Sequence, residues 1–151
     1  LMTAEDTRFL HCNIKTLNLL PSVMIATRTS REGCHEAVLH RGGRVTEGSH
    51  SNVHIIKNGT FRTAPTDHLI LPGIARAHLI GICKKNGIPV DETAFTVDEM
   101  MDADEVIVSS SSCLCRGAYS IDGTEVGGRA PEILDLLCRE TLKEFNGETD
   151  I

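Results

Sequence analysis

The chain has 151 residues, a formal net charge of −6, and 40% hydrophobic and 24% charged residues. This length suits one domain with its own core, and the composition is ordinary for a globular protein. The acidic balance argues against a nucleic-acid binder, which normally presents a basic face. Because no apolar run approaches the roughly 20 residues that span a bilayer, we expect no membrane partner.

In chain order, the first predicted element is an amphipathic helix that starts near Pro21 and ends before Gly33. Strands separated by glycine-containing turns follow and indicate an antiparallel meander. They are predicted over residues 36–40, 44–47, 52–57 and 60–63. In the third of these, Val53 and Ile55 lie on one face, and His54 and Ile56 lie on the other.

The second half of the chain mixes helices and strands. Helices are predicted over residues 74–85, 97–102 and 131–145, with Thr96 as a cap and Gly147 beyond the last helix. Strands are predicted over 89–96 and 105–109, and a hairpin over 119–126. Since strands and helices do not alternate strictly, the predicted class is α+β, with a mainly antiparallel sheet or pseudo-barrel and flanking helices.

The six cysteines are irregularly spaced and do not indicate a disulfide framework. Only Cys113 and Cys115 are close in sequence, and no second pair completes a zinc site. No secretory signal is visible in the sequence, so we expect a cytoplasmic protein with reduced thiols and no bound metal. The start at Leu1 suggests a fragment of a longer protein.

Lys15 is the first candidate for chemistry, because it lies between Ile14 and Leu17 just before an apolar helix. A lysine desolvated by apolar neighbours can act as a nucleophilic amine. The alternative is a lysine whose head reaches water. Local composition alone favours that alternative.

Three further segments could meet a ligand. Glu47, at a strand end before a serine-rich turn, could pair with a buried cation, although an exposed turn is the simpler explanation. Gly73 precedes a helix whose free N–H groups would favour an anion such as phosphate. A buried strand delivers the hydroxyls of residues 109–112, which is typical of a ligand site and also of a polar loop.

Taken together, these segments resemble the class IV aminotransferases, the fold-type IV group of pyridoxal phosphate (PLP) enzymes. The resemblance rests on Asn13–Leu20, Val45–Ser49 and Leu69–Ile74, followed in order by the serine-rich loop. It extends over about residues 8–126 and is strongest to the D-amino-acid aminotransferase branch. The branched-chain aminotransferases and the aminodeoxychorismate lyases are other branches.

The resemblance implies PLP as the cofactor and transamination between an amino acid, expected in the D form, and a 2-oxo acid. It implies that Lys15 forms the Schiff base with PLP and then moves the proton at the substrate Cα. Glu47 would bond the pyridine nitrogen and keep it protonated. Leu71 would pack against the cofactor ring.

The resemblance also implies how the phosphate is held. Backbone N–H groups of Ile74 and Ala75 would bind it, helped by the Ser111 hydroxyl, with Ser110 and Ser112 lining the same pocket. Ala75 departs from the family, because a hydroxyl residue is common there and one phosphate hydrogen bond would be lost.

The resemblance finally implies missing chain. Family members carry a smaller N-terminal domain that supplies a phosphate-binding arginine and most of the groups that hold the substrate carboxylate. Residues 1–151 would then be the PLP-binding C-terminal domain of a homodimeric enzyme, with little or no turnover alone. The lyase branch, the branched-chain branch and a non-enzymatic domain stay open as alternatives.

Overall fold

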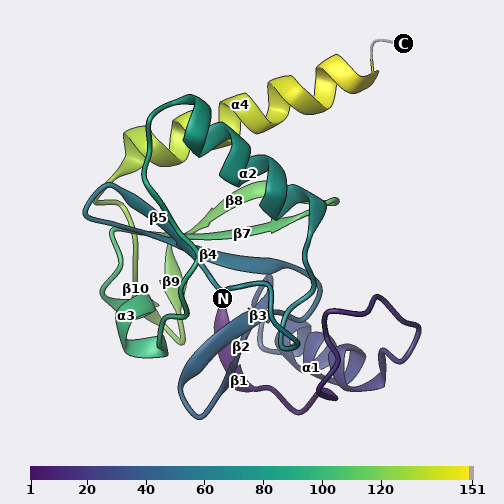
Figure 1. The fold of residues 1–151 in the computed structure, drawn as a ribbon. Helices are drawn as coiled ribbons and strands as arrows, with labels where there is room; N and C mark the ends of the chain where they lie inside the picture. Colours follow the sequence, from purple (N-terminus) through teal and green to yellow (C-terminus); the bar gives the residue numbers. More distant parts are fainter. Residues whose placement is uncertain (150–151) are drawn as a thin grey trace.

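A five-stranded sheet lies at the centre of the computed structural model, which describes residues 1–149 (Figure 1). Its strand order is β6 (Val90–Asp91), β5 (Thr60–Thr63), β4 (Asn52–Lys57), β7 (Glu105–Ser110) and β8 (Leu114–Ala118). Helices α2 (Ile74–Lys85) and α4 (Pro131–Thr149) lie along one face of this sheet.

A three-stranded sheet lies against the other face of the central sheet (Figure 1). It contains β1 (Met2–Glu5), β2 (Ala37–Arg41) and β3 (Arg44–Gly48). The remaining elements are α1 (Leu20–Arg31), the short α3 (Val97–Met101), and a hairpin of β9 (Ser120–Ile121) and β10 (Thr124–Glu125). Helix α1 packs beside the smaller sheet, away from α2 and α4 (Figure 1).

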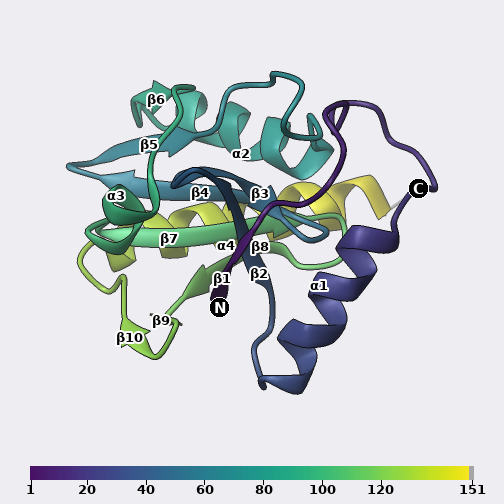
Figure 2. The ribbon, with the colours of Figure 1, turned by 90° about the horizontal axis from the view of Figure 1, so that it is seen from below.

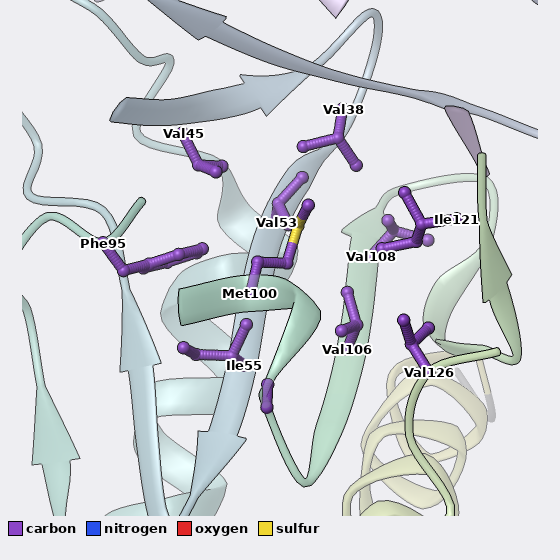
Figure 3. Packing of buried hydrophobic residues seen from close by; sticks show 11 residues of the cluster. Val38, Val45, Val53, Ile55, Phe95, Met100, Val106, Val108, Ile121 and Val126 are labelled. Atoms are coloured by element: carbon purple, nitrogen blue, oxygen red, sulfur yellow. The ribbon is translucent and has the colours of Figure 1, made fainter. Parts of the chain in front are cut away.

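Alternation along β4 creates two apolar cores, one on each face of the central sheet. Val53 and Ile55 face the three-stranded sheet and pack with Val38, Val45 and neighbours (Figure 3). The opposite face packs against the two helices through a second cluster, which includes Ile56, Phe61, Leu79, Ile107 and Leu137. Burying each such side chain contributes roughly 1.5–3 kcal/mol, so the central sheet is fixed from both sides.

Most predicted elements are confirmed. The α+β class and the mainly antiparallel pairing hold, although β1 pairs with β2 and β5 pairs with β6 in parallel. Helices α1 and α2 have the expected bounds, and α3 begins with the expected Thr96 cap, in a reciprocal capping box with Glu99. The hairpin around Asp122 is also present.

The single meander predicted over residues 36–64 is wrong, because the chain changes sheets after β3. The Gly48 N–H donates to the Ser51 carbonyl over 2.6 Å, which closes a tight turn. A Cβ at Gly48 would lie 2.1 Å from the Ser51 hydroxyl oxygen, so glycine is required there. Strands β3 and β4 therefore belong to different sheets.

Three other predictions are corrected. The strand predicted over 89–96 is only two residues long, because the Asp91 side chain accepts the Thr93 N–H and turns the chain. Helix α4 continues through Gly147, since one glycine costs a helix only about 1 kcal/mol. Strands β1 and β8 were not predicted. The short β1 depends on pairing with the distant β2. Strand β8 forms a hairpin with β7, whose turn over 111–113 lacks the glycine or asparagine that signals a hairpin. Within residues 1–149, no helix is long and apolar enough to cross a membrane.

Candidate active site

Glu47, at the end of β3, is a buried carboxylate with three hydrogen-bond donors. Its Oε1 accepts from the Arg8 guanidinium. Its Oε2 accepts from the Leu71 N–H over 2.9 Å and from the Asn52 side-chain amide over 3.1 Å. The side chain is therefore fixed in direction by three different segments of the chain.

Arg8 belongs to a larger buried ion network. Its guanidinium also pairs with Asp6 over 2.9 Å, and Asp6 in turn accepts from Arg41 over 3.1 Å and from the Thr46 hydroxyl over 3.0 Å. Burial raises the pKa of Asp6, but hydrogen bonds from Arg8 and Arg41 outweigh it and bring that pKa down to about 2. Asp6 thus stays charged and holds Arg8 against Glu47.

The protonation of Glu47 responds mainly to burial. Burial raises the pKa of Glu47 to about 7, although the charge and hydrogen bond of Arg8 and the Leu71 N–H favour the ionised form. Near neutral pH the carboxyl is therefore divided between its two forms. A further cation or N–H donor beside it would shift it to the charged form.

Asn52 connects Glu47 to the start of α2. Its amide also donates to the Leu71 carbonyl over 2.9 Å. A Cβ at Gly73 would lie 2.2 Å from the Asn52 side-chain oxygen, so only glycine permits this approach. The segment before α2 is thereby held next to the carboxylate.

The start of α2 opens onto a cavity of about 200 Å³. Ile74, Ala75 and Ser111 line it together, although Ser111 comes from the turn between β7 and β8. Gly73 caps α2 without a side-chain hydrogen bond. The first N–H groups of the helix are therefore available to an anion, which the helix dipole also favours.

Lys15 lies in the long segment between β1 and α1 and is exposed. Within the described part of the chain it makes no hydrogen bond or ion pair. The segment is attached to the rest of the chain at several points. Arg8 binds Glu47, and Arg41 donates to the Phe9 carbonyl over 3.1 Å. The Cys12 N–H donates to the His68 carbonyl over 2.9 Å. The segment therefore passes beside the loop that leads to α2 (Figure 2).

A comparison with models of known protein families identifies the family of this chain. Residues 2–121 match the model of "Amino-transferase class IV". The chain belongs to the class IV aminotransferases. This match includes Lys15, Glu47, Leu71 and the serine-rich turn.

Relatives of this class IV aminotransferase chain are similar in both sequence and structure. It is 46% identical over 132 residues to a D-alanine aminotransferase of Listeria monocytogenes, covering 86% of this chain and 46% of that protein. It is 43% identical over 130 residues to the enzyme of that name from Bacillus licheniformis, with the same shares covered. The branched-chain amino acid aminotransferase of Escherichia coli superposes with a TM-score of 0.80 at 27% identity, over 97% of this chain and 50% of that one. The chain thus spans about half the length of these relatives.

The structure brings the predicted site residues of this aminotransferase chain into two groups. Glu47 accepts a hydrogen bond from the backbone N–H of Leu71. Ile74, Ala75 and Ser111 share the cavity at α2. Ser110 and Ser112 lie in the same turn, with their hydroxyls 3.0 Å apart. No hydrogen bond within residues 1–149 joins Lys15 to either group, and the roles of all these residues stay predictions.

Sequence reasoning missed Arg8 and Asn52. Asn52 lies close to Glu47 in the sequence, at the start of β4, but its contact with the Leu71 carbonyl depends on a loop 19 residues further along the chain. Arg8 lies 39 residues before its partner. The available signal was the rule that a buried carboxylate needs a compensating cation, but this rule does not say which of several arginines supplies it.

Proposed function

We propose that this chain is the cofactor-bearing C-terminal half of a PLP-dependent aminotransferase. The enzyme would exchange the amino group of a D-amino acid, with D-alanine as the first candidate, for the oxo group of a 2-oxo acid. The names of the relatives support this choice of substrate, at 43–46% identity. Their length supports a missing half, because the chain covers only 46% of each.

Glu47 carries the proposal, because its surroundings suit the ring nitrogen of PLP. A carboxylate offers about four acceptor positions, and Arg8, Asn52 and Leu71 occupy three. The remaining position can accept one N–H. A protonated pyridine nitrogen would supply that N–H together with a positive charge, and it would favour the ionised form of a carboxyl whose pKa burial raises to about 7.

The start of α2 suits the phosphate of the same cofactor. The backbone N–H groups of Ile74 and Ala75 and the hydroxyl of Ser111 would hold it. Asn52 bonds both to Glu47 and to the loop that leads into α2. The spacing between the ring-nitrogen and phosphate sites is thus set by this side chain and by Gly73.

When bound, PLP supplies an electron-withdrawing ring that weakens the Cα–H bond of the attached amino acid. Lys15 would hold the cofactor covalently through its amine, and would then take the proton from the substrate Cα and return it. Glu47 would keep a proton on the ring nitrogen, with Arg8 fixing the direction of its carboxylate. Leu71 would contact the ring with its side chain while its N–H holds Glu47 in place.

The half outside this chain would complete the enzyme. We propose that an N-terminal domain supplies the groups that bind the substrate carboxylate and closes the site over Lys15. The complete enzyme would be a cytoplasmic homodimer. The exposed apolar residues near Lys15, among them Ile14, Leu17 and Leu20, are consistent with a surface that another domain or subunit covers.

The direct test is to incubate the protein with PLP, reduce it with borohydride, and locate any pyridoxyl adduct by peptide mass spectrometry. This chain and the longer gene product are treated side by side. An adduct confined to Lys15 and lost in Lys15→Ala is the expected result. An adduct only in the longer protein would mean that the missing half is needed to hold the cofactor. No adduct in either protein would contradict the proposal and favour a non-enzymatic domain.

A substrate comparison then separates the branches of the family. The longer protein is given D-alanine, L-leucine or aminodeoxychorismate, with 2-oxoglutarate as amino acceptor for the first two. Preferred turnover of D-alanine is expected. Preference for L-leucine would indicate a branched-chain aminotransferase, and release of pyruvate from aminodeoxychorismate would indicate the lyase.

A further inference from the structure

Two thiols that are distant in sequence lie together on the face of the central sheet that α2 and α4 cover. Cys115 is on β8 and Cys138 is on α4, and their Sγ atoms are 3.6 Å apart. The Cys138 Sγ also lies 3.5 Å from the Cys115 carbonyl oxygen. All six cysteines are free thiols in the structure, so this is a pair of neighbouring reduced groups.

The position of the pair permits a covalent bond between the two sulfurs. A disulfide bond is about 2.05 Å long, so the sulfurs need to approach by only ~1.5 Å, which we expect rotation of the two side chains to supply. Both residues are only partly buried. Neither residue is fully enclosed by the protein, and we expect a small oxidant to reach the pair from solvent.

The two thiols also differ in acidity. The hydrogen bond with Cys115 lowers the pKa of Cys138 to about 7, against smaller opposing effects of burial and of Asp135 on the same helix. The same hydrogen bond, together with burial and the nearby Cys113 and Cys83, raises the pKa of Cys115. Within the pair, Cys138 is therefore the sulfur that is favoured as the thiolate.

We propose that Cys138 and Cys115 form a peroxide-sensitive modification site, at which oxidation produces an intramolecular disulfide between α4 and β8. The Cys138 thiolate attacks one oxygen of the peroxide, the O–O bond breaks, and protonation of the leaving oxygen gives water or an alcohol. Cys138 is then a sulfenic acid. The Cys115 sulfur attacks the sulfenic sulfur, the S–O bond breaks, and water leaves with the thiol proton. Two thiols are oxidised and one peroxide is reduced.

The disulfide would tie together two elements that border the cavity at α2. Leu114, next to Cys115, lines that cavity, and so does Thr141, one helical turn after Cys138. Oxidation would therefore fix β8 against α4 behind the cavity. The chemistry needs only the two cysteines and does not depend on the proposed aminotransferase function.

The test uses the whole 151-residue chain, reduced, freed of reductant, and treated with limiting hydrogen peroxide. Remaining thiols are blocked with N-ethylmaleimide and the digest is analysed without reduction. A peptide pair linking Cys115 to Cys138, absent after dithiothreitol, is expected. At pH 7 the Cys138 thiol should react roughly fivefold faster than a thiol of ordinary pKa, and the rate should level off above about pH 7.

Variants identify the attacking and the resolving sulfur. Cys115→Ser should leave Cys138 as a sulfenic acid that dimedone captures, with no internal link. Cys138→Ser should slow the oxidation of Cys115 by peroxide severalfold. Cys34→Ser is the matched control, because Cys34 is also partly buried but packs in the core beside the smaller sheet, and it should behave as the unaltered chain. A link between Cys113 and Cys115, or oxidation of Cys34 at the same rate as Cys138, would overturn the proposal.

Discussion

The fold places Glu47 and Lys15 in opposite environments, one buried and hydrogen-bonded and the other exposed. Glu47 is 5% exposed and bonded to three segments of the chain. Lys15 is exposed, lies in a long segment without regular structure, and has no polar partner within residues 1–149. A group that sets a charge environment needs fixed geometry, which burial provides. In the proposed function Lys15 forms a bond and then moves a proton, which needs freedom of movement, and a surface outside this chain would enclose it.

The largest expected effect comes from replacing Lys15, the exposed member of this comparison. Lys15→Ala should reduce transamination by the longer enzyme by at least about 10²–10⁴-fold, because the amine that moves the proton is lost. The free energy of unfolding should change by less than about 0.5 kcal/mol, since the residue is exposed and unbonded. Turnover assays and urea unfolding measure the two effects. Lys84→Ala, at an exposed site in α2, should change neither.

Glu47→Gln removes the negative charge of the buried side chain while keeping its shape. Loss of a charge-assisted bond to the ring nitrogen is worth roughly 1.5–3 kcal/mol, which is about a 10–150-fold loss of turnover. Steady-state kinetics of the longer enzyme measures this loss. Glu105→Gln is the matched control, because Glu105 is equally buried but binds the Ala130 N–H on the far side of the sheet. An equal loss in both variants would mean that Glu47 acts only through the fold.

Burial of Glu47 should also be visible as a pH effect on stability. Its pKa rises from 4.5 to about 7 on folding, so the native state takes up a proton and gains stability as the pH falls through this interval. Burial lowers the pKa of His54 from 6.5 to about 3, with Arg76 adding to the shift, so the unfolded state takes up that proton and stability is lost below pH 6.5.

These two opposing titrations should nearly cancel in the unaltered chain between pH 6.5 and 5. Glu47→Gln removes one of them. Its free energy of unfolding should fall by about 1–2 kcal/mol over that interval, because one proton of difference is worth about 1.4 kcal/mol per pH unit. Urea unfolding at several pH values measures this, and adding His54→Asn should flatten the dependence again. A flat profile in Glu47→Gln alone would contradict the assigned burial effects.

The smallest expected effect concerns the phosphate end of the site. Ser111→Ala should weaken PLP binding by about tenfold, since a hydrogen bond to a charged group such as phosphate is worth at least about 1.5 kcal/mol. The affinity for pyridoxal, which lacks the phosphate, should not change. Absorbance titration of the longer protein with both compounds measures the difference. Ser120→Ala, at a distant hairpin, serves as the control. Equal weakening towards both compounds would remove Ser111 from the phosphate site.

The sequence by itself determined features whose causes are local. Each of these features follows from residues that are only a few positions apart in the sequence. They are the start of α1 at Leu20–Pro21, the reciprocal cap of Thr96 and Glu99, and the two faces of β4. The short motifs around Lys15 and Glu47 determined the family for the same reason, because each is a contiguous run.

Tertiary structure alone decided which distant groups meet. It joined Arg8 to Glu47, placed Asn52 between that carboxylate and α2, and set Cys138 beside Cys115. It also sent β3 and β4 into different sheets, although a hairpin pattern predicted one meander. Such contacts depend on the packing of both apolar cores, and the free energy of packing belongs to no single stretch of sequence.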